Sequence, residues 1–273
     1  LILLITLNYL YGSIIISNYN KIDSKKISST IKIISPKIKI DRFYDNEKPY
    51  EIINELIKLS NPKSEKNTIF VFPEGILTGV YMNDLKNYRE LFSENYSLNH
   101  QIILGINSTE NNKIYNSLIV MNKDTNILAK YNKNKLVPFG EFLPLENFLS
   151  KFGLKKITQG YRSFSNDNKR NIININNLNF VPLICYEIIY SGKINKTKEN
   201  FNLILNISED GWFGNSVGPY QHFSHSVFRS IEEGKNLIRS ANNGISAFIN
   251  SKGEIINQIK STERGVIEVK SFK

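Results

Sequence analysis

The chain contains one cysteine, Cys185, which follows an apolar run over 181–184 with the composition of a buried strand. Many α/β folds place reactive groups at the carboxyl ends of strands, so a thiol in this position is a candidate nucleophile. The competing interpretation is an inert cysteine packed at the end of a core strand, because free cysteine is among the most buried residue types. The cysteine alone leaves both interpretations open.

Two other apolar runs end just before a side chain that would activate such a thiol. The run over 70–72 is followed by Glu74, and the run that begins at Ile127 is followed by Lys133. A thiol is a weak nucleophile until it loses its proton, which a carboxylate can accept, and an ammonium group stabilises a thiolate and an oxyanion. Singly, Glu74 fits a surface turn and Lys133 fits a solvated basic run. Together with Cys185, they predict a Glu–Lys–Cys site that works without histidine.

Composition narrows the class of protein further. At 273 residues and 41% hydrophobic content, the chain can form one large domain with a sizeable core. One cysteine excludes an internal disulfide framework and a cysteine-based metal cluster, and three histidines argue against a histidine-rich metal site. We expect no metal and no other cofactor. The net charge of +10 comes from scattered lysines and arginines without interleaved aromatic residues, which argues against a nucleic-acid partner.

The elements that would position these residues alternate between strands and helices. Periodicity predicts helices over 50–59 and 85–96, and a third whose apolar stripe is Phe223, Val227, Ile231 and Ile238. Runs of strand type cover 31–40, 68–72, 101–106, 114–121, 172–175, 180–184, 203–207, 245–249, 255–259 and 266–269. This order predicts a mixed α/β domain in which helices cover a buried sheet. Pro182 is awkward for a central strand, because proline cannot donate to a sheet ladder.

Two segments have an irregular composition. Residues 136–145 combine large apolar side chains with prolines and a glycine, which predicts a shaped loop. Residues 149–169 are polar, and we expect them to be exposed. Because they closely follow the 136–145 loop, we also expect them to cover the site.

The start of the chain differs from the rest. Residues 1–17 are apolar and uncharged, and as a helix they would extend about 25 Å, slightly less than a hydrocarbon core. We expect them to be the end of a membrane span whose beginning lies upstream. A buried β-segment is the alternative. The polar residues 18–29 are predicted to be a linker, and 30–273 the catalytic domain.

Longer sequence motifs carry a family resemblance. Phe-Pro-Glu at 72–74, YNKNKLVPFGE at 131–141 and Ile-Cys-Tyr-Glu at 184–187 resemble the nitrilase, or carbon–nitrogen hydrolase, superfamily. That resemblance implies a Glu–Lys–Cys triad on an αββα sandwich. LVPFGEFLPLE at 136–146, DGWFG at 210–214, GPYQHF at 218–223 and RSANNGIS at 239–246 are similar to a narrower family, the apolipoprotein N-acyltransferases. The resemblance covers about residues 30–270.

The resemblance assigns the three central roles residue by residue. Cys185 matches the acyl-accepting nucleophile, Glu74 the general base and Lys133 the triad lysine. Lys135 is a rival for the last role, but it falls where the family usually has histidine.

Further positions match supporting residues of the family. Glu141 matches a second glutamate near the thiol, Tyr186 and Glu187 match the residues beside the nucleophile, and the Tyr186 N–H is a candidate oxyanion donor. Trp212 and Phe213 either anchor a turn in the core or line an acyl or lipid pocket.

The narrower family also implies a reaction and a location. The thiol would take an acyl chain from a phospholipid as a thioester, and the α-amine of a lipid-modified N-terminal cysteine on an apolipoprotein would then accept it. The family is bacterial and implies a multi-helix domain in the inner membrane, with the catalytic domain facing the periplasm. Two alternatives remain: a soluble amidase or nitrilase with the same triad, and an inactive membrane-tethered fragment.

Overall fold

The computed structural model describes residues 1–20, 25–44, 48–145, 148, 163–194 and 199–272. Its helices are α1 (Ile2–Asn20), α2 (Pro49–Ser60), α3 (Arg89–Asn95) and α5 (Gly218–Glu233), with short 3₁₀ helices η1 (Ile40–Phe43), η2 (Met82–Tyr88), η4 (Cys185–Ile189) and η5 (Gly211–Phe213). The strands are β1 (Lys25–Ser35), β2 (Thr68–Val71), β3 (His100–Glu110), β4 (Lys113–Met121), β5 (Ile127–Asn132), β6 (Ile173–Ile175), β7 (Leu178–Ile184), β8 (Leu203–Glu209), β9 (Asn236–Asn242), β10 (Ser246–Ile249), β11 (Ile255–Ile259) and β12 (Gly265–Phe272).

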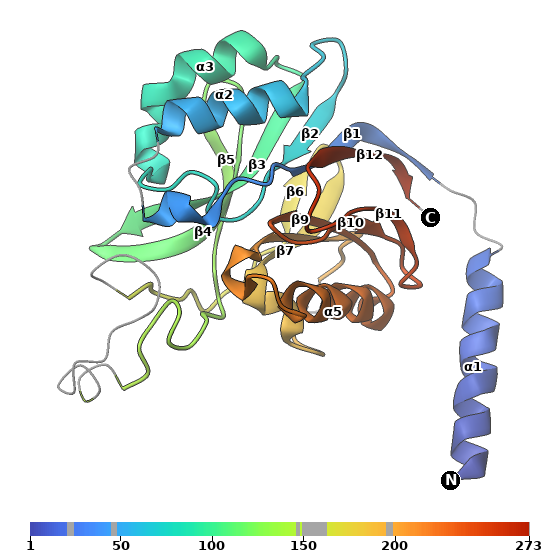
Figure 1. The fold of residues 1–273 in the computed structure, drawn as a ribbon. Helices are drawn as coiled ribbons and strands as arrows, with labels where there is room; N and C mark the ends of the chain where they lie inside the picture. Colours follow the sequence, from blue (N-terminus) through green and yellow to red (C-terminus); the bar gives the residue numbers. More distant parts are fainter. Residues whose placement is uncertain (21–24, 45–47, 146–147, 149–162, 195–198, 273) are drawn as a thin grey trace.

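These strands form two sheets that pack face to face between layers of helix (Figure 1). The first sheet has the order β12-β1-β2-β3-β4-β5, and the second has the order β11-β10-β9-β8-β7-β6. One apolar cluster joins the inner faces of both sheets and includes Ile69, Ile103, Ile184 and Leu205. Helices α2 and α3 cover the outer face of the first sheet, and α5 covers that of the second. This αββα sandwich is the fold that the family resemblance implied, and it agrees with the mixed α/β class that the sequence patterns predicted.

Helix α2 illustrates why the sequence folds in this way locally. Pro49 opens it at a position where a missing N–H costs nothing, and Asn61 ends it in the left-handed conformation. Between them, Ile52, Ile53, Leu56 and Ile57 recur at helical spacing, and all are buried. Burial of one such side chain contributes roughly 1.5–3 kcal/mol, so tertiary packing holds this short helix in place.

The centre of each sheet is parallel, and this determines where the site forms. Strands β1, β2 and β3 run parallel, as do β7, β8 and β9. The carboxyl ends of parallel neighbours lie at the same edge of their sheet. Glu74 follows β2, Cys185 follows β7, and Asp210 follows β8.

Pro182 lies where strand β7 tolerates the missing N–H. Strand β6 pairs with β7 only from Leu178 to Phe180, so within the described residues the β6 side of β7 has no strand partner at Pro182. N–H groups two residues apart in a strand point the same way, and the N–H of Ile184 is bonded to the Glu187 carboxylate instead of to β8. Proline at 182 therefore costs no ladder hydrogen bond.

Several expected elements differ in extent. Ile238 lies in β9 and not on the α5 stripe, because Gly234 ends that helix in the left-handed conformation. The strand expected over 31–40 ends at Ser35, and Ile40 begins η1. The expected linker over 18–29 includes the end of α1 and the start of β1, while residues 21–24 lie outside the described residues.

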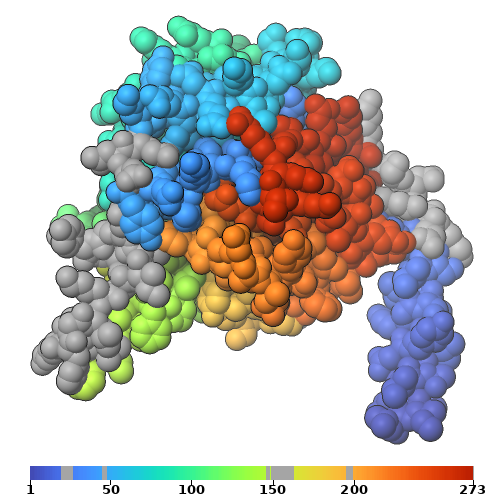
Figure 2. Space-filling model, viewed as in Figure 1, coloured from blue at the N-terminus to red at the C-terminus, as the bar shows by residue number. Residues whose placement is uncertain are grey.

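Helix α1 stands apart from the sandwich, at its side in the two views (Figures 1 and 2). Residues 2–19 are long and apolar enough for a membrane span by length and composition, and none of that stretch is buried inside the protein. The alternative of a buried β-segment is therefore wrong. That this helix crosses a membrane stays a prediction.

Candidate active site

Cys185 is the first residue of η4, directly after β7. Its φ is +48°, a left-handed conformation that costs a residue other than glycine about 1–2 kcal/mol. The residue is partly exposed, whereas the β7 residues before it are buried. Strain and partial exposure at the carboxyl end of a parallel strand are features of a presented nucleophile, and they disfavour the interpretation of Cys185 as core packing.

Lys133 links two carboxylates in a buried cluster. Its Nζ lies 3.2 Å from Glu74 Oε1 and 2.9 Å from Glu141 Oε1. The Nδ2 of Asn116, on β4, donates to the same two oxygens, at 2.7 Å each. Lys133 is only 1% exposed, so water screens these charges little.

The remaining carboxylate oxygens are fixed by main-chain donors. Glu74 Oε2 accepts from the N–H of Glu209 at 3.0 Å, and Glu141 Oε2 accepts from the N–H of Val137 at 2.9 Å. Gly105 lets β3 pass close to Glu74, since a Cβ there would lie 2.5 Å from the Glu74 Cα. Each carboxylate is thus held on both oxygens before any substrate arrives.

The charges of this cluster act on the thiol in opposite directions. Although the residue is partly exposed, the surrounding protein desolvates the thiol and raises the pKa of Cys185 well above its ordinary value. The carboxylates of Glu74 and, to a smaller extent, Asp210 raise this pKa further, whereas the ammonium of Lys133 and a hydrogen bond with Ser208 lower it. Burial lowers the pKa of Lys133, but Glu141 and Glu74 more than offset this, and that pKa lies well above its usual range. The resting site therefore holds a neutral thiol beside a permanent cation, and the thiol needs a base.

Glu187 ties the lysine loop to the cysteine turn. Its Oε1 accepts from the N–H groups of Asn134 and Lys135, at 2.9 and 3.1 Å, and its Oε2 accepts from the N–H of Ile184 at 2.9 Å. One buried carboxylate therefore contacts the residues directly after Lys133 and the residue directly before Cys185. Lys135 takes part through its main chain, and its side chain lies outside the Glu74–Glu141 cluster.

The family match can now be placed on this geometry. A model of the family described as carbon–nitrogen hydrolase matches residues 34–270. The chain belongs to the carbon–nitrogen hydrolase family. Cys185 and the buried cluster of Glu74, Lys133, Glu141 and Asn116 all lie inside the matched range.

Curated relatives within this carbon–nitrogen hydrolase family give a narrower similarity. The chain is 35% identical over 250 residues to an apolipoprotein N-acyltransferase of Rhizobium leguminosarum, covering 87% of this chain and 47% of that protein. It is 30% identical over 273 residues to an apolipoprotein N-acyltransferase of Rickettsia prowazekii, covering 97% of this chain and 53% of that protein. The resemblance drawn from the sequence is confirmed. The chain spans about half the length of these relatives.

Solved structures agree on the fold of this carbon–nitrogen hydrolase. A CN-hydrolase superfamily protein of Xanthomonas campestris superposes with a TM-score of 0.61 at 13% identity, covering 92% of this chain and 91% of that chain. At this identity the likeness shows the shared sandwich and nothing about substrate.

Trp212 and Phe213 lie on η5 and are not core anchors. They are 39% and 41% exposed, so neither ring is enclosed. The Trp212 ring lies 4.9 Å from that of Phe43, and the Phe213 ring lies 5.5 Å from that of His222. Two exposed aromatic side chains therefore lie close to the carboxyl end of β8, and their contact with an acyl chain stays a prediction.

Several buried polar residues of the site were not identified from the sequence. Asn116 has no local signal, because nothing distinguishes it from the neighbouring polar residue Ser117 of the same strand. Tyr131 and Arg170 both donate to the Glu187 carboxylate, at 2.6 and 2.9 Å, and only the folded chain brings them to it. Asp210, His222 and Arg239 occur inside the family motifs quoted above. Their place in those motifs was the one sequence feature that could have pointed to them as site residues.

The segment over 149–169 was expected to cover the site, and residues 149–162 lie outside the described residues. The described end of this segment contacts the site loops through its backbone. Phe164 N–H donates to the Glu141 carbonyl at 2.9 Å, and Asp167 N–H donates to the Lys133 carbonyl at 3.1 Å. Most of 163–169 is partly buried, and three of its residues are exposed.

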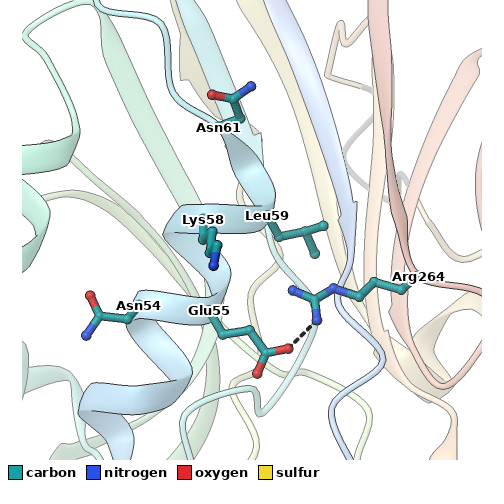
Figure 3. Close-up of a pocket in the computed structure, with 6 residues that line it drawn as sticks. All are labelled: Asn54, Glu55, Lys58, Leu59, Asn61 and Arg264. Atoms are coloured by element: carbon teal, nitrogen blue, oxygen red, sulfur yellow. Dashed lines mark hydrogen bonds and ion pairs between the residues drawn. The ribbon is translucent and has the colours of Figure 1, made fainter.

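A hollow on the surface lies elsewhere, beside α2 and the residue that precedes β12 (Figure 3). The carboxylate of Glu55 and the guanidinium of Arg264 form an ion pair of 2.5 Å at its wall. None of the hollow's lining residues belongs to the cluster around Cys185. Among the residues described by the structure, no group of three or more His, Cys, Asp or Glu side chains is placed to hold a metal ion.

Proposed function

We propose that this chain is the catalytic part of an apolipoprotein N-acyltransferase. It would move an acyl chain from a phospholipid to the N-terminal amine of a lipid-modified cysteine on an apolipoprotein, through a thioester on Cys185. The observation that carries the proposal is the strained, partly exposed cysteine beside the buried Glu74–Lys133–Glu141 cluster. The relatives named apolipoprotein N-acyltransferase support this substrate class over other substrates of the fold.

The first half-reaction forms the thioester. Glu74 accepts the thiol proton as sulfur attacks the ester carbonyl carbon of the phospholipid. The carbonyl oxygen becomes an oxyanion, which the Lys133 ammonium and the Tyr186 N–H stabilise. The intermediate then expels the lysophospholipid alkoxide, which takes the proton back from Glu74. The raised pKa of Cys185 explains why a base is needed before the thiol can attack.

The second half-reaction transfers the acyl chain. The acceptor amine attacks the thioester carbonyl, and Glu74 accepts the proton that the amine loses. The same donors stabilise the second oxyanion. Cys185 leaves as a thiolate and recovers its proton from Glu74, so the enzyme returns to its starting state.

Glu141 keeps Lys133 in place for both steps, and Asn116 holds the carboxylates of Glu74 and Glu141. A single carboxylate would leave the lysine free to follow Glu74 whenever Glu74 changes its protonation. Because Glu141 is held by the Val137 N–H and also contacts Lys133, the ammonium stays fixed when Glu74 is protonated. Glu141 is thus a positioning residue for the cation.

The substrates place the reaction at a membrane surface. Residues 1–17 would form the end of a span, 18–29 would lead out of the bilayer, and 30–273 would be the catalytic domain, facing the periplasm from the bacterial inner membrane. The apolar, exposed surface of α1 supports this arrangement. The exposed Trp212 and Phe213 would contact the acyl chain of the donor.

Transfer can be tested in vesicles that contain a phospholipid with a radiolabelled acyl chain and a synthetic diacylglyceryl-cysteine peptide. The proposal predicts labelled peptide with the native chain and none with Cys185→Ser. Label that reaches the peptide equally well with Cys185→Ser would refute the thioester route. Hydrolysis of a short-chain water-soluble amide at a rate similar to phospholipid transfer would favour the soluble amidase instead.

A further inference from the structure

A second buried cluster contacts the main chain of the nucleophile from the side of α5. His222 Nε2 lies 3.2 Å from the carbonyl oxygen of Cys185, and its Nδ1 lies 2.9 Å from Asp210 Oδ1. His222 is 5% exposed and Asp210 is fully buried. A carbonyl oxygen can only accept a hydrogen bond, so this contact assigns a proton to Nε2, which donates it to Cys185. Arg239 Nη2 lies 3.1 Å from the other ring nitrogen, Nδ1.

Asp210 is itself held rigidly, and together with Arg239 it holds the Nδ1 side of the ring. Arg239 Nη2 donates to both of its oxygens, at 2.7 and 3.0 Å, and Ser208 Oγ donates to Oδ1 at 2.7 Å. Burial raises the pKa of Asp210, but Arg239 and His222 lower it well below its ordinary value, so the carboxylate stays charged. Gly244 packs against this carboxylate, where a Cβ would collide with it.

The same cluster also holds the main chain before the nucleophile. Arg239 donates to the side-chain oxygen of Asn206, and Asn206 Nδ2 donates to the carbonyl oxygen of Leu183 at 3.1 Å. The carbonyl groups of residues 183 and 185 are therefore both fixed by side chains of one network. This network holds the strained turn at the end of β7 without contacting the thiol's acid–base partners Glu74 and Lys133.

The carbonyl of Cys185 and the N–H of Tyr186 belong to one peptide group. A trans peptide is planar, and its carbonyl and N–H point in opposite directions. A hydrogen bond that fixes the direction of the Cys185 carbonyl therefore fixes the direction of the Tyr186 N–H. Tyr186 is the second residue of η4, and a 3₁₀ helix does not use that N–H internally.

We propose that His222 is a positioning residue that aims the Tyr186 N–H at the oxyanion. It acts through the 185–186 peptide and does not touch the reacting atoms. Its hydrogen bond also polarises that peptide, which makes the N–H a better donor. This inference rests on the proposed acyl transfer and adds the part of the protein that holds the oxyanion donor in place.

Two substitutions distinguish the effect of the hydrogen bond to Cys185 from the effect of losing the imidazole ring. The amide nitrogen of His222→Gln reaches the position of Nε2 and can still donate to the Cys185 carbonyl. The shorter amide of His222→Asn reaches only the position of Nδ1. His225→Asn, on the same helix and outside the network, is the matched control.

Each protein is assayed as the full chain in detergent with p-nitrophenyl butyrate, a small ester whose attack by sulfur creates an oxyanion. The burst of p-nitrophenolate gives the acylation rate. Alkylation of Cys185 by iodoacetamide gives a second rate, which requires the thiolate but forms no oxyanion. We expect His222→Asn to lower acylation about 10–100-fold, because one misdirected donor loses much of its effect, and to change alkylation less than about threefold.

His222→Gln should restore acylation to within about fivefold of the native rate, and His225→Asn should leave both rates unchanged. Native acylation in His222→Asn would overturn the inference. So would equal losses in both rates, or a His222→Gln variant as slow as His222→Asn. The ester does not depend on phospholipid, so a chain that fails to use phospholipid would refute the proposed function and leave this comparison intact.

Discussion

The two sheets contribute different things to the region around Cys185. The first sheet and the loops that follow its strands supply Glu74, Lys133 and Asn116, whose side chains form the charged cluster that acts on the thiol. The second sheet and the helix α5 that covers it supply the cysteine and the Asp210–His222–Arg239 network, which with Asn206 bonds to carbonyl groups of the main chain.

The difference indicates how the work is divided. The base and the cation come from the first sheet, and the buried polar side chains that hold the main chain of the nucleophile come from the second sheet and α5. Asp210 and Ser208 of the second group also have a smaller direct effect on the pKa of Cys185. The inner apolar cluster that joins the sheets therefore also sets the distance between nucleophile and base. Substitutions in each group should produce different kinds of defect.

The largest effect is expected from removing the base. Glu74→Gln keeps an oxygen for Lys133 and Asn116 but cannot accept the thiol proton. Formation of the acyl-enzyme should fall about 10²–10⁴-fold, as measured by rapid-quench labelling from phospholipid vesicles. Glu51→Gln, at an exposed glutamate on α2, should behave as the native chain. An unimpaired Glu74→Gln variant would move the base elsewhere.

Removing the cation should damage both activity and stability. Lys133→Met leaves the carboxylates of Glu74 and Glu141 facing each other without a counter-charge, and loss of one partner from a buried ion pair costs about 3–5 kcal/mol. Urea denaturation should show this loss, whereas exposed Lys86→Met should not. Equal stability of the two variants would mean that the carboxylates are not held as charged groups.

A substitution in the Asp210–His222–Arg239 network should lower the stability of the fold by an amount that does not depend on pH near neutrality. Asp210→Asn removes the charge that pairs with buried Arg239, at a cost of about 3–5 kcal/mol. The pKa of Asp210 is lowered on folding, so its stabilisation is present above its unfolded pKa and is lost only as the pH falls through the folded value. The destabilisation measured in urea should therefore be the same at pH 6 and pH 8. A cost that disappears at pH 6 would contradict this.

The smallest expected effect is an increase in the rate at which Cys185 is alkylated in the same Glu74→Gln variant. It distinguishes the role of Glu74 as a base from the effect of its charge on the thiol. The Glu74 carboxylate raises the pKa of Cys185, so Glu74→Gln should lower that pKa and increase the thiolate fraction at any pH below it. Iodoacetamide should therefore alkylate Cys185 a few-fold faster in Glu74→Gln, although acylation is slower. Slower alkylation in this variant would indicate that Glu74 assists sulfur in every reaction.

Much of the fold was predictable because local patterns and tertiary packing agree. The helix over 50–59 has its apolar side chains at helical spacing, and the strand runs at 68–72 and 203–207 are buried in the structure. The expected stripe through Ile238 was wrong because a left-handed glycine and a buried strand override helical periodicity there.

The sequence predicted only those site residues whose side chains are reactive by type and stand in a recognisable motif. Cys185, Glu74 and Lys133 stand at strand ends, and each is reactive by type. Asn116 and Arg170 are defined by what they contact across the fold, and no spacing in the sequence indicates those contacts. The bond from His222 to the Cys185 carbonyl joins a helix to a turn 37 residues away, and the backbone it supports has no side-chain signature.

The central claim is that Cys185 carries the acyl chain, and mass spectrometry of the intact protein tests it most directly. The chain is mixed with vesicles of a single phospholipid, without acceptor, and then quenched in acid. We predict a mass increase equal to one acyl group, placed on Cys185 by peptide mapping, removed by neutral hydroxylamine and absent from Cys185→Ala. An acyl group on any other residue, or the same increase in Cys185→Ala, would contradict the account.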